Sequence, residues 1–360
     1  MLKKVASIFL ALAIISCFAA SVFAEDKTNN KSSPTSMLVL GDSISTGYGL
    51  QNYNLDMTKT TSYANLLAQK YSVKNTYFNM AFDGQTSEQL ASNLNRKLYD
   101  DYIKKSDVIL ISIGGNDVMD ILSKAVIEAL GMSKNSTVMD IKNIDFTNTQ
   151  VYKNLINYIT SNKLNILRKQ IVSEFQKNFL TIYQYIHKLN PNAYLIFQTV
   201  YNPFSGVKNI EIVNNLAELI IPRVNKIITS NSTVRIDGKT EKMYDYIDTY
   251  SAFYSKASQY TNILNLDIHP NADGHKVIFE MCDKLISKHY NIATDVILNQ
   301  PQASIKNSAS SSNNLTGNAI MSSTNVGNSI QRTFIIMIST GVFGITLLAV
   351  YMYKKKNKKK

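Results

Sequence analysis

The chain has 360 residues and a formal net charge of +12. The six lysines within Lys354–Lys360, together with Lys3 and Lys4, leave a charge of only +4 on all the rest. That excess is too small to indicate nucleic-acid binding, and a basic tail needs only anionic lipid headgroups as partners.

The amino terminus is typical of a secretory signal peptide. Lys3 and Lys4 precede an apolar run that closes on Val22-Phe23-Ala24, before the acidic Glu25. A lipoprotein signal with Cys17 as the lipidated residue is the alternative, but apolar residues continue beyond Cys17. Residues 1–24 are therefore predicted to be removed. Cys282 is then the one cysteine left, so no intramolecular disulfide is expected.

The carboxyl terminus is predicted to anchor the protein in a membrane. Residues 333–353 hold an uncharged apolar run of about twenty residues, the length needed to cross a hydrocarbon core. The basic tail, residues 354–360, favours the cytoplasmic side. Residues 300–332 are rich in Ser, Asn and Thr, which predicts a disordered stalk. The expected localisation is a single-pass cell-membrane protein with its main body outside the cell.

The remaining body, residues 35–299, alternates strand and helix patterns, which predicts a parallel sheet covered by helices on both faces. The strand candidates are Met37–Leu40, Asn75–Met80, Val108–Ile113, Tyr194–Val200 and, more weakly, Tyr244–Thr249. The helical patterns are Tyr63–Tyr71, Ser87–Leu98, Val151–Leu189, Glu211–Ile228 and Asp273–His289. The stretch Val118–Asn148 fits this alternation poorly. It is predicted to be a helix over Val118–Leu130 followed by a polar loop, and is interpreted as an insertion beside the carboxyl edge of the sheet.

The first strand candidate ends in Gly41-Asp42-Ser43. A buried strand with this ending places a hydroxyl at the carboxyl edge of the sheet, where open α/β sheets bind ligands. By themselves these residues are more typical of a helix N-cap than of a catalytic site. The functional interpretation therefore depends on the residues at the ends of the other strands.

Three further motifs are expected at the same edge. Gly84 comes after the second strand candidate, and Gly114-Gly115-Asn116-Asp117 after the third. Asp267-Ile268-His269-Pro270 precedes the last helix. Because parallel strands end at one edge, a serine, a glycine, an asparagine and a histidine from distant parts of the chain should meet there.

These four blocks, in this order, resemble those of the SGNH hydrolases, also called GDSL esterases or lipases. Gly41-Asp42-Ser43 is similar to their first block, and Asn79-Met80-Ala81 through Gly84 to their second. Gly114 to Asp117 and Asp267 to Pro270 are similar to the third and the last. The resemblance implies an α/β fold: a flavodoxin-like three-layer α/β/α sandwich with a parallel sheet of about five strands. It also implies hydrolysis of esters or related acyl groups.

Acyl transfer needs a nucleophile, a base, and donors aimed at the developing oxyanion. Ser43 is the candidate nucleophile, and His269 is the candidate base because its near-neutral pKa range suits proton transfer. The predicted oxyanion hole consists of the Ser43 N–H, the Gly84 N–H and the Asn116 side-chain amide. No metal cluster or nucleotide fingerprint is evident in the sequence, and no cofactor is expected.

One position departs from the family pattern. The catalytic acid usually lies three residues before the histidine, and here that residue is Leu266, whereas Asp267 lies two before. Asp267 either orients His269 in a triad, which is defined by geometry rather than spacing, or the site is a Ser–His dyad.

The sequence leaves the substrate open among a lipid, a lysophospholipid and an O-acylated glycan. Two alternative functions also remain. One is a catalytically silent surface module that binds wall polysaccharide or lipid. The other is an O-acyltransferase that uses the same site but passes the acyl group to a sugar hydroxyl instead of water.

Overall fold

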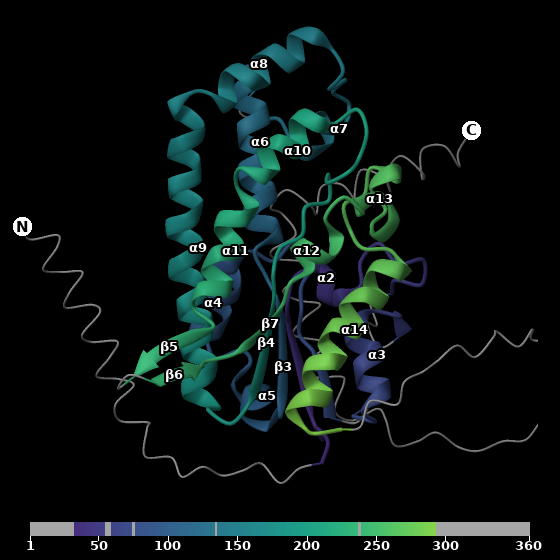
Figure 1. Cartoon of the computed structure of the whole chain (residues 1–360), viewed down its shortest axis with the longest axis vertical. Helices are drawn as coiled ribbons and strands as arrows, with labels where there is room; N and C mark the ends of the chain where they lie inside the picture. The colour runs from purple at the N-terminus through teal and green to yellow at the C-terminus, as the bar shows by residue number, and fades with distance from the viewer. Residues whose placement is uncertain (1–31, 55–58, 74–75, 134, 237–238, 293–360) are drawn as a thin grey trace, which may run out of the picture.

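A five-stranded parallel sheet forms the middle of the molecule (Figure 1). The computed structural model describes residues 32–54, 59–73, 76–133, 135–236 and 239–292. The strand order is β2-β1-β3-β4-β7, and every neighbouring pair is parallel. These strands are β1 (Met37–Gly41), β2 (Tyr77–Asn79), β3 (Val108–Ser112), β4 (Tyr194–Gln198) and β7 (Asp245–Ile247). Both the predicted flavodoxin-like α/β/α sandwich and its five strands are confirmed.

The side chains of the central strands alternate between two apolar cores. In β1, Leu38 and Leu40 enter the larger core, whereas Met37 and Val39 enter the smaller one. This alternation reflects the period of two in a strand, and it explains why β1 is continuously apolar: both of its faces are covered. Helices α3 (Tyr63–Lys70) and α14 (Ala272–His289) cover the smaller core. In Figure 1 they stand together on one side of the sheet.

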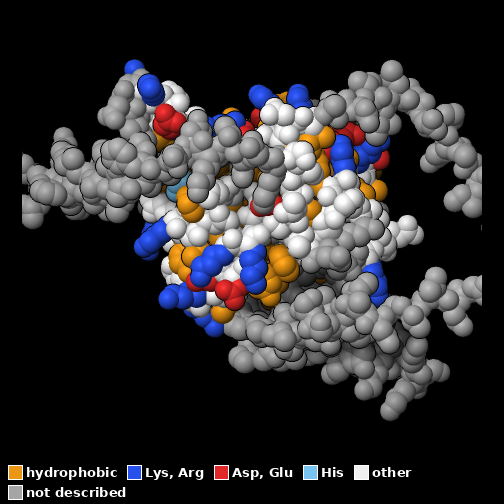
Figure 2. Space-filling view, turned by 90° about the horizontal axis from the view of Figure 1, so that it is seen from below, with side chains coloured by type: hydrophobic (Ala, Val, Ile, Leu, Met, Phe, Trp, Pro, Cys, Tyr) orange, Lys and Arg blue, Asp and Glu red, His pale blue; other side chains and the backbone are white. Residues whose placement is uncertain are grey.

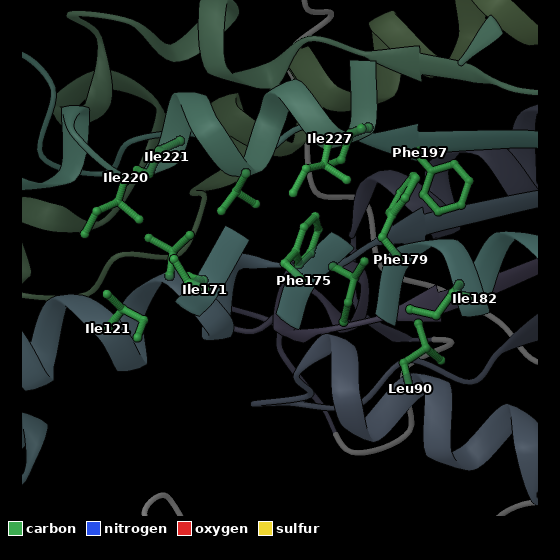
Figure 3. Packing of buried hydrophobic residues seen from close by; sticks show 14 of the residues in the cluster. Leu90, Ile121, Ile171, Phe175, Phe179, Ile182, Phe197, Ile220, Ile221 and Ile227 are labelled. Carbon is green, nitrogen blue, oxygen red and sulfur yellow. The ribbon is translucent and has the colours of Figure 1, made fainter. Parts of the chain in front are cut away.

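The larger core lies between the sheet and a group of helices that includes α9 (Asn162–Leu189). Figure 3 shows Phe175 and Phe179 of α9 packed among isoleucines and against Phe197 of β4. The rings of Phe179 and Phe197 have centroids 4.8 Å apart. The other helices of this layer are α4 (Ser87–Asn95), α5 (Asp100–Lys105), α6 (Gly115–Ala129), α8 (Thr149–Ile159), α10 (Glu211–Glu218) and α11 (Ile221–Ser230).

Two of the long helical patterns are each divided into two helices. The pattern over Val151–Leu189 breaks because Ser161 caps α9, accepting a hydrogen bond from the Lys163 N–H at 3.2 Å. The pattern over Glu211–Ile228 breaks before Pro222, whose missing N–H is tolerated only in the first turn of a helix. In both cases a local backbone requirement ends a helix that the apolar spacing alone would continue.

The helix predicted over Val118–Leu130 is confirmed as α6, but its interpretation as part of an insertion beside the sheet is wrong. Helix α6 buries Val118, Ile121 and Leu122 in the larger core, so it is one of the covering helices. The second half holds α7 (Val138–Lys142).

The sequence patterns also missed an antiparallel hairpin, β5 (Thr233–Ile236) with β6 (Lys239–Lys242), because its second strand is fully exposed and carries no apolar alternation.

The predicted signal peptide, stalk, membrane helix and basic tail lie outside the described residues. Among those that are described, no helix combines the length and apolar character that a membrane span requires. Figure 2 views the molecule from below, the end opposite the carboxyl edge of the sheet, where lysine and arginine side chains are scattered among apolar ones.

Candidate active site

The four sequence blocks converge at the carboxyl edge of the sheet, on either side of the β1–β3 pair. Strand order reverses there, since β2 lies on one side of β1 and β3 on the other, and ligands bind at such a switch point. Gly41 ends β1 with φ +119°, and a Cβ there would lie 1.8 Å from the Ser112 carbonyl oxygen. Only glycine fits this close approach, so Gly41 fixes where the chain turns toward Ser43.

Ser43 opens α2 (Ser43–Thr46), a single turn of helix directly after β1. Asp42 is its N-cap and accepts a hydrogen bond from the Ile44 N–H at 3.1 Å and another from the Ser112 hydroxyl at 2.9 Å. The capping interpretation of Asp42 is thus confirmed, and it is compatible with a site at Ser43. The Ser43 N–H stands in the first turn, where a helix offers it no carbonyl partner.

His269 bridges Ser43 and Asp267. Its Nε2 lies 2.9 Å from the Ser43 Oγ, and its Nδ1 lies 2.5 Å from Asp267 Oδ1. A carboxylate can only accept, so Nδ1 carries the proton and the neutral ring leaves Nε2 to accept the Ser43 hydroxyl proton. This is the order of groups that activates a serine nucleophile.

Asp267 reaches His269 in spite of the shortened spacing. Leu266 adopts a left-handed conformation with φ +59°, which turns the chain so that Asp267 Oδ1 accepts both the ring Nδ1–H and, at 3.1 Å, the backbone N–H of His269. Burial acts to raise the pKa of Asp267, but the hydrogen bonds and charge of His269 outweigh it and hold the pKa below its ordinary value. The carboxylate is therefore ionised at neutral pH.

Gly84 and Asn116 are linked to the Ser43 segment by hydrogen bonds. The Thr46 hydroxyl donates to Asp83 Oδ1 at 2.5 Å, and Asn116 Nδ2 donates to the Gln85 carbonyl at 2.9 Å. Gly84, between those two contacts, has φ +78°, and an added Cβ would meet nothing within 4 Å. Its backbone therefore borders open space. Asn116 donates one of its two amide hydrogens to Gln85, and the other has no protein acceptor within the described ranges.

The sequence did not indicate several groups around this site. The Tyr48 ring packs against the His269 ring at a tilt of 59°, with centroids 4.6 Å apart, and Tyr53 donates to Asp83 Oδ2 at 2.5 Å. The buried Tyr201 hydroxyl donates to the Ile268 carbonyl at 2.8 Å. Neither Tyr48 nor Tyr53 belongs to a motif, and tyrosine is abundant in the chain, so no sequence signal distinguishes them. Tyr201 does have a signal: it directly follows the fourth strand candidate, where a residue either lines the cleft or packs in a turn.

Asp42 is the most electrostatically perturbed group beside Ser43. Burial raises its pKa to about 7, although the hydrogen bonds from Ser112 and Ile44 and the nearby His269 oppose that rise. Its position is structural: it holds α2 against β3. Within the described ranges, no group of three or more His, Cys, Asp or Glu side chains could hold a metal ion.

Comparison with known proteins decides the family. The model of the GDSL-like lipase/acylhydrolase family matches residues 39–277, which is more than half of the chain. The chain belongs to this family. Membership places it among the acylhydrolases, the enzymes that cleave ester bonds. The predicted resemblance to the GDSL esterases and lipases is thereby confirmed.

Individual proteins that are similar to this chain share less than a quarter of their aligned residues with it. Protein YpmR of Bacillus subtilis (strain 168), described as uncharacterized, is 24% identical over 211 residues, which cover 58% of this chain and 66% of YpmR. The solved structure of the lipase Lip_vut3 from a goat rumen metagenome is 19% identical with a TM-score of 0.47, covering 69% of this chain and 96% of that one. Phospholipase A1 from Streptomyces albidoflavus is 17% identical with a TM-score of 0.47, covering 70% and 99%.

Proposed function

We propose that this family member is a serine esterase that transfers an acyl group from a carboxylic ester to Ser43 and then to water. The observation that carries the proposal is the continuous hydrogen-bonded line from Ser43 Oγ through His269 to Asp267. A silent binding module has no need of this alignment, whereas a serine hydroxyl is a weak nucleophile until a neighbouring base takes its proton.

In the proposed first step, Ser43 Oγ attacks the carbonyl carbon of the ester while His269 Nε2 takes the hydroxyl proton. Asp267 stabilises the imidazolium that forms. Collapse of the tetrahedral intermediate breaks the bond to the leaving alkoxide, which receives the proton from Nε2. Water then repeats the sequence on the acyl-enzyme, with His269 as base, and releases the carboxylic acid and free Ser43.

The proposed oxyanion hole uses the Ser43 N–H, the Gly84 N–H and the remaining amide hydrogen of Asn116. Three features support it: the first-turn position of Ser43, the open space at Gly84, and the orientation of Asn116 by Gln85. Donors that are fixed before the reaction stabilise the developing charge at no reorganisation cost, and removing one costs about 10²–10³ in kcat in a comparable enzyme.

We place the catalytic domain on the outer cell surface, on the strength of the predicted signal peptide, residues 1–24, and the predicted membrane helix, residues 333–353. Substrates available there include lipids, lysophospholipids and O-acylated glycans. A chain-length series of aryl esters, run beside an acetylated glycan with and without a sugar acceptor, separates these classes. Acyl transfer to the acceptor in place of acid release would identify an O-acyltransferase.

A fluorophosphonate probe tests the nucleophile. The probe should label the wild-type chain on Ser43, and Ser43→Ala should abolish labelling and lower turnover by about 10³-fold or more. Ser45→Ala is the matched control, because Ser45 is buried in the same turn but its hydroxyl bonds to Tyr63 at 2.8 Å. Labelling that survives in the Ser43→Ala variant would refute the assignment.

A further inference from the structure

We propose that Asn262 is a positioning residue that holds the Asp267–His269 loop against the nucleophile segment. It immediately precedes the short helix η3 (Ile263–Asn265), on the loop that carries His269. This inference concerns the geometry of the site and rests on the proposed function only for its kinetic consequence. Neither the four sequence blocks nor the spacing of the catalytic groups points to Asn262.

Asn262 contacts the loop at both of its functional residues through its backbone. Its N–H donates to the His269 carbonyl at 2.9 Å, and its carbonyl accepts from the Asp267 N–H at 3.3 Å. The stretch from Asp267 to His269 is therefore tied at both of its ends to one residue. This is the stretch in which the acid has moved one position closer to the base, directly after Leu266 with its φ of +59°.

The side chain of Asn262 extends this link to the nucleophile. Its Nδ2 donates to the Gly49 carbonyl at 2.9 Å. The two residues before Gly49, Gly47 and Tyr48, each donate a backbone N–H to the Ser43 carbonyl at 3.1 Å. A path of hydrogen bonds and backbone thus joins Ser43 to His269 without passing through the Ser43 hydroxyl or the imidazole, and the Asn262 amide is its central link.

Close packing at Gly49 reinforces that link. Gly49 has φ +90°, and a Cβ there would lie 2.8 Å from the His269 Cβ, 3.1 Å from Asn262 Nδ2 and 3.2 Å from Asp267 Oδ2. No larger residue fits between the nucleophile segment and the catalytic pair. Misplacing reacting groups by about 1 Å can cost about 10²-fold in rate, so loss of this contact should act on kcat.

The test replaces Asn262 with alanine in the full chain. Asn262→Ala should lower kcat for an aryl ester by about 10- to 100-fold and leave KM within about twofold, because the Asn262 amide is bonded to the Gly49 carbonyl and acts on the alignment of the reacting groups. Asn265→Ala is the matched control: this side chain is exposed and makes no hydrogen bond to any described part of the chain. It should keep kcat unchanged. The midpoint of thermal unfolding should be similar in both variants.

A second readout does not depend on turnover. The proton between His269 Nδ1 and Asp267 should give a low-field proton NMR resonance in the wild type, identified by its loss in His269→Gln. Asn262→Ala should broaden it or remove it. An unchanged resonance with kcat within twofold of wild type would overturn the inference, as would a wild-type chain that lacks the resonance. A wild type that shows the resonance but cleaves no ester would refute the proposed function alone, and the resonance of the variant would still decide the role of Asn262.

Gly49→Ala provides a further variant in case Asn262→Ala alters folding. It should lower kcat at least as strongly, because its Cβ would press directly on His269. Gly131→Ala is its control, since Gly131 also has a positive φ, +61°, but its Cβ would meet nothing within 4 Å. Equal kinetic losses in these two glycine variants would contradict the steric part of the argument.

Discussion

Replacing Asp267 with asparagine should separate a catalytic triad from a dyad. The substitution keeps the size of the side chain and removes its charge. In the structure the carboxylate is 2.5 Å from the imidazole and 31% exposed, so it is close to His269 but partly screened by water. The imidazolium formed during attack would lose the negative partner that contacts its Nδ1.

The expected loss of kcat can be worked out by treating the imidazolium and the carboxylate as two unit charges. Two unit charges about 4 Å apart at an effective dielectric constant of about 20 attract by about 4 kcal/mol. That interaction exists only once the imidazole is protonated, so its loss raises the barrier to acyl transfer by nearly the same amount. Since each 1.4 kcal/mol is about tenfold, kcat should fall by about 10³. Asparagine that turns its amide toward Nδ1 would impose the wrong tautomer and bring the loss to about 10⁴.

The assay is hydrolysis of an aryl ester across a range of pH. Besides the fall in kcat, the limb that reports deprotonation of the general base should move to lower pH, because a neighbouring negative charge no longer favours the protonated form. Asp273→Asn is the matched control, an exposed carboxylate in the first turn of α14. A loss below about tenfold with an unmoved profile would refute the reasoning and establish a Ser43–His269 dyad.

Two further predictions concern stability and topology. Burial, and to a lesser extent the charge of His269, lower the pKa of His275 to about 3, so the folded state resists its protonation. Below about pH 6.5 the histidine of the unfolded chain gains a proton that the folded chain resists, so the free energy of unfolding falls as the pH falls. Relative to His275→Gln, the free energy of unfolding of the wild type should drop by about 2 kcal/mol between pH 8 and pH 5. Denaturant titrations of both proteins measure this difference, and parallel pH dependences would contradict it. Protease added to intact cells should release an active fragment that ends within residues 300–332, whereas activity protected until lysis would show that the predicted orientation is wrong.

The strands of the sheet and their parallel arrangement were accessible from sequence because the physical signals are local, whereas the strand order came from the structure. An apolar run such as Met37–Leu40 specifies a strand buried on both faces, and alternation with helical patterns specifies parallel pairing. Local signals also limited the prediction. Helix ends at Ser161 and Pro222 depend on single capping and backbone groups, and the exposed β6 strand has no apolar pattern to mark it.

The active site likewise has residues that the sequence could identify and contacts that it could not. The sequence by itself was enough to predict the family and to single out Ser43, Gly84, Asn116 and His269. Each of them lies in a short motif, after a strand candidate or before the last helix, that can be recognised without knowing its neighbours in space. Only the tertiary structure decided whether Asp267 reaches the imidazole. That contact depends on a left-handed backbone at Leu266 and on hydrogen bonds from Asn262, which lies far from Ser43 in the chain. These contacts leave no periodic trace in the sequence: a left-handed backbone at one residue sets the first, and the second joins the Asn262 side chain to the Gly49 backbone, 213 residues away along the chain.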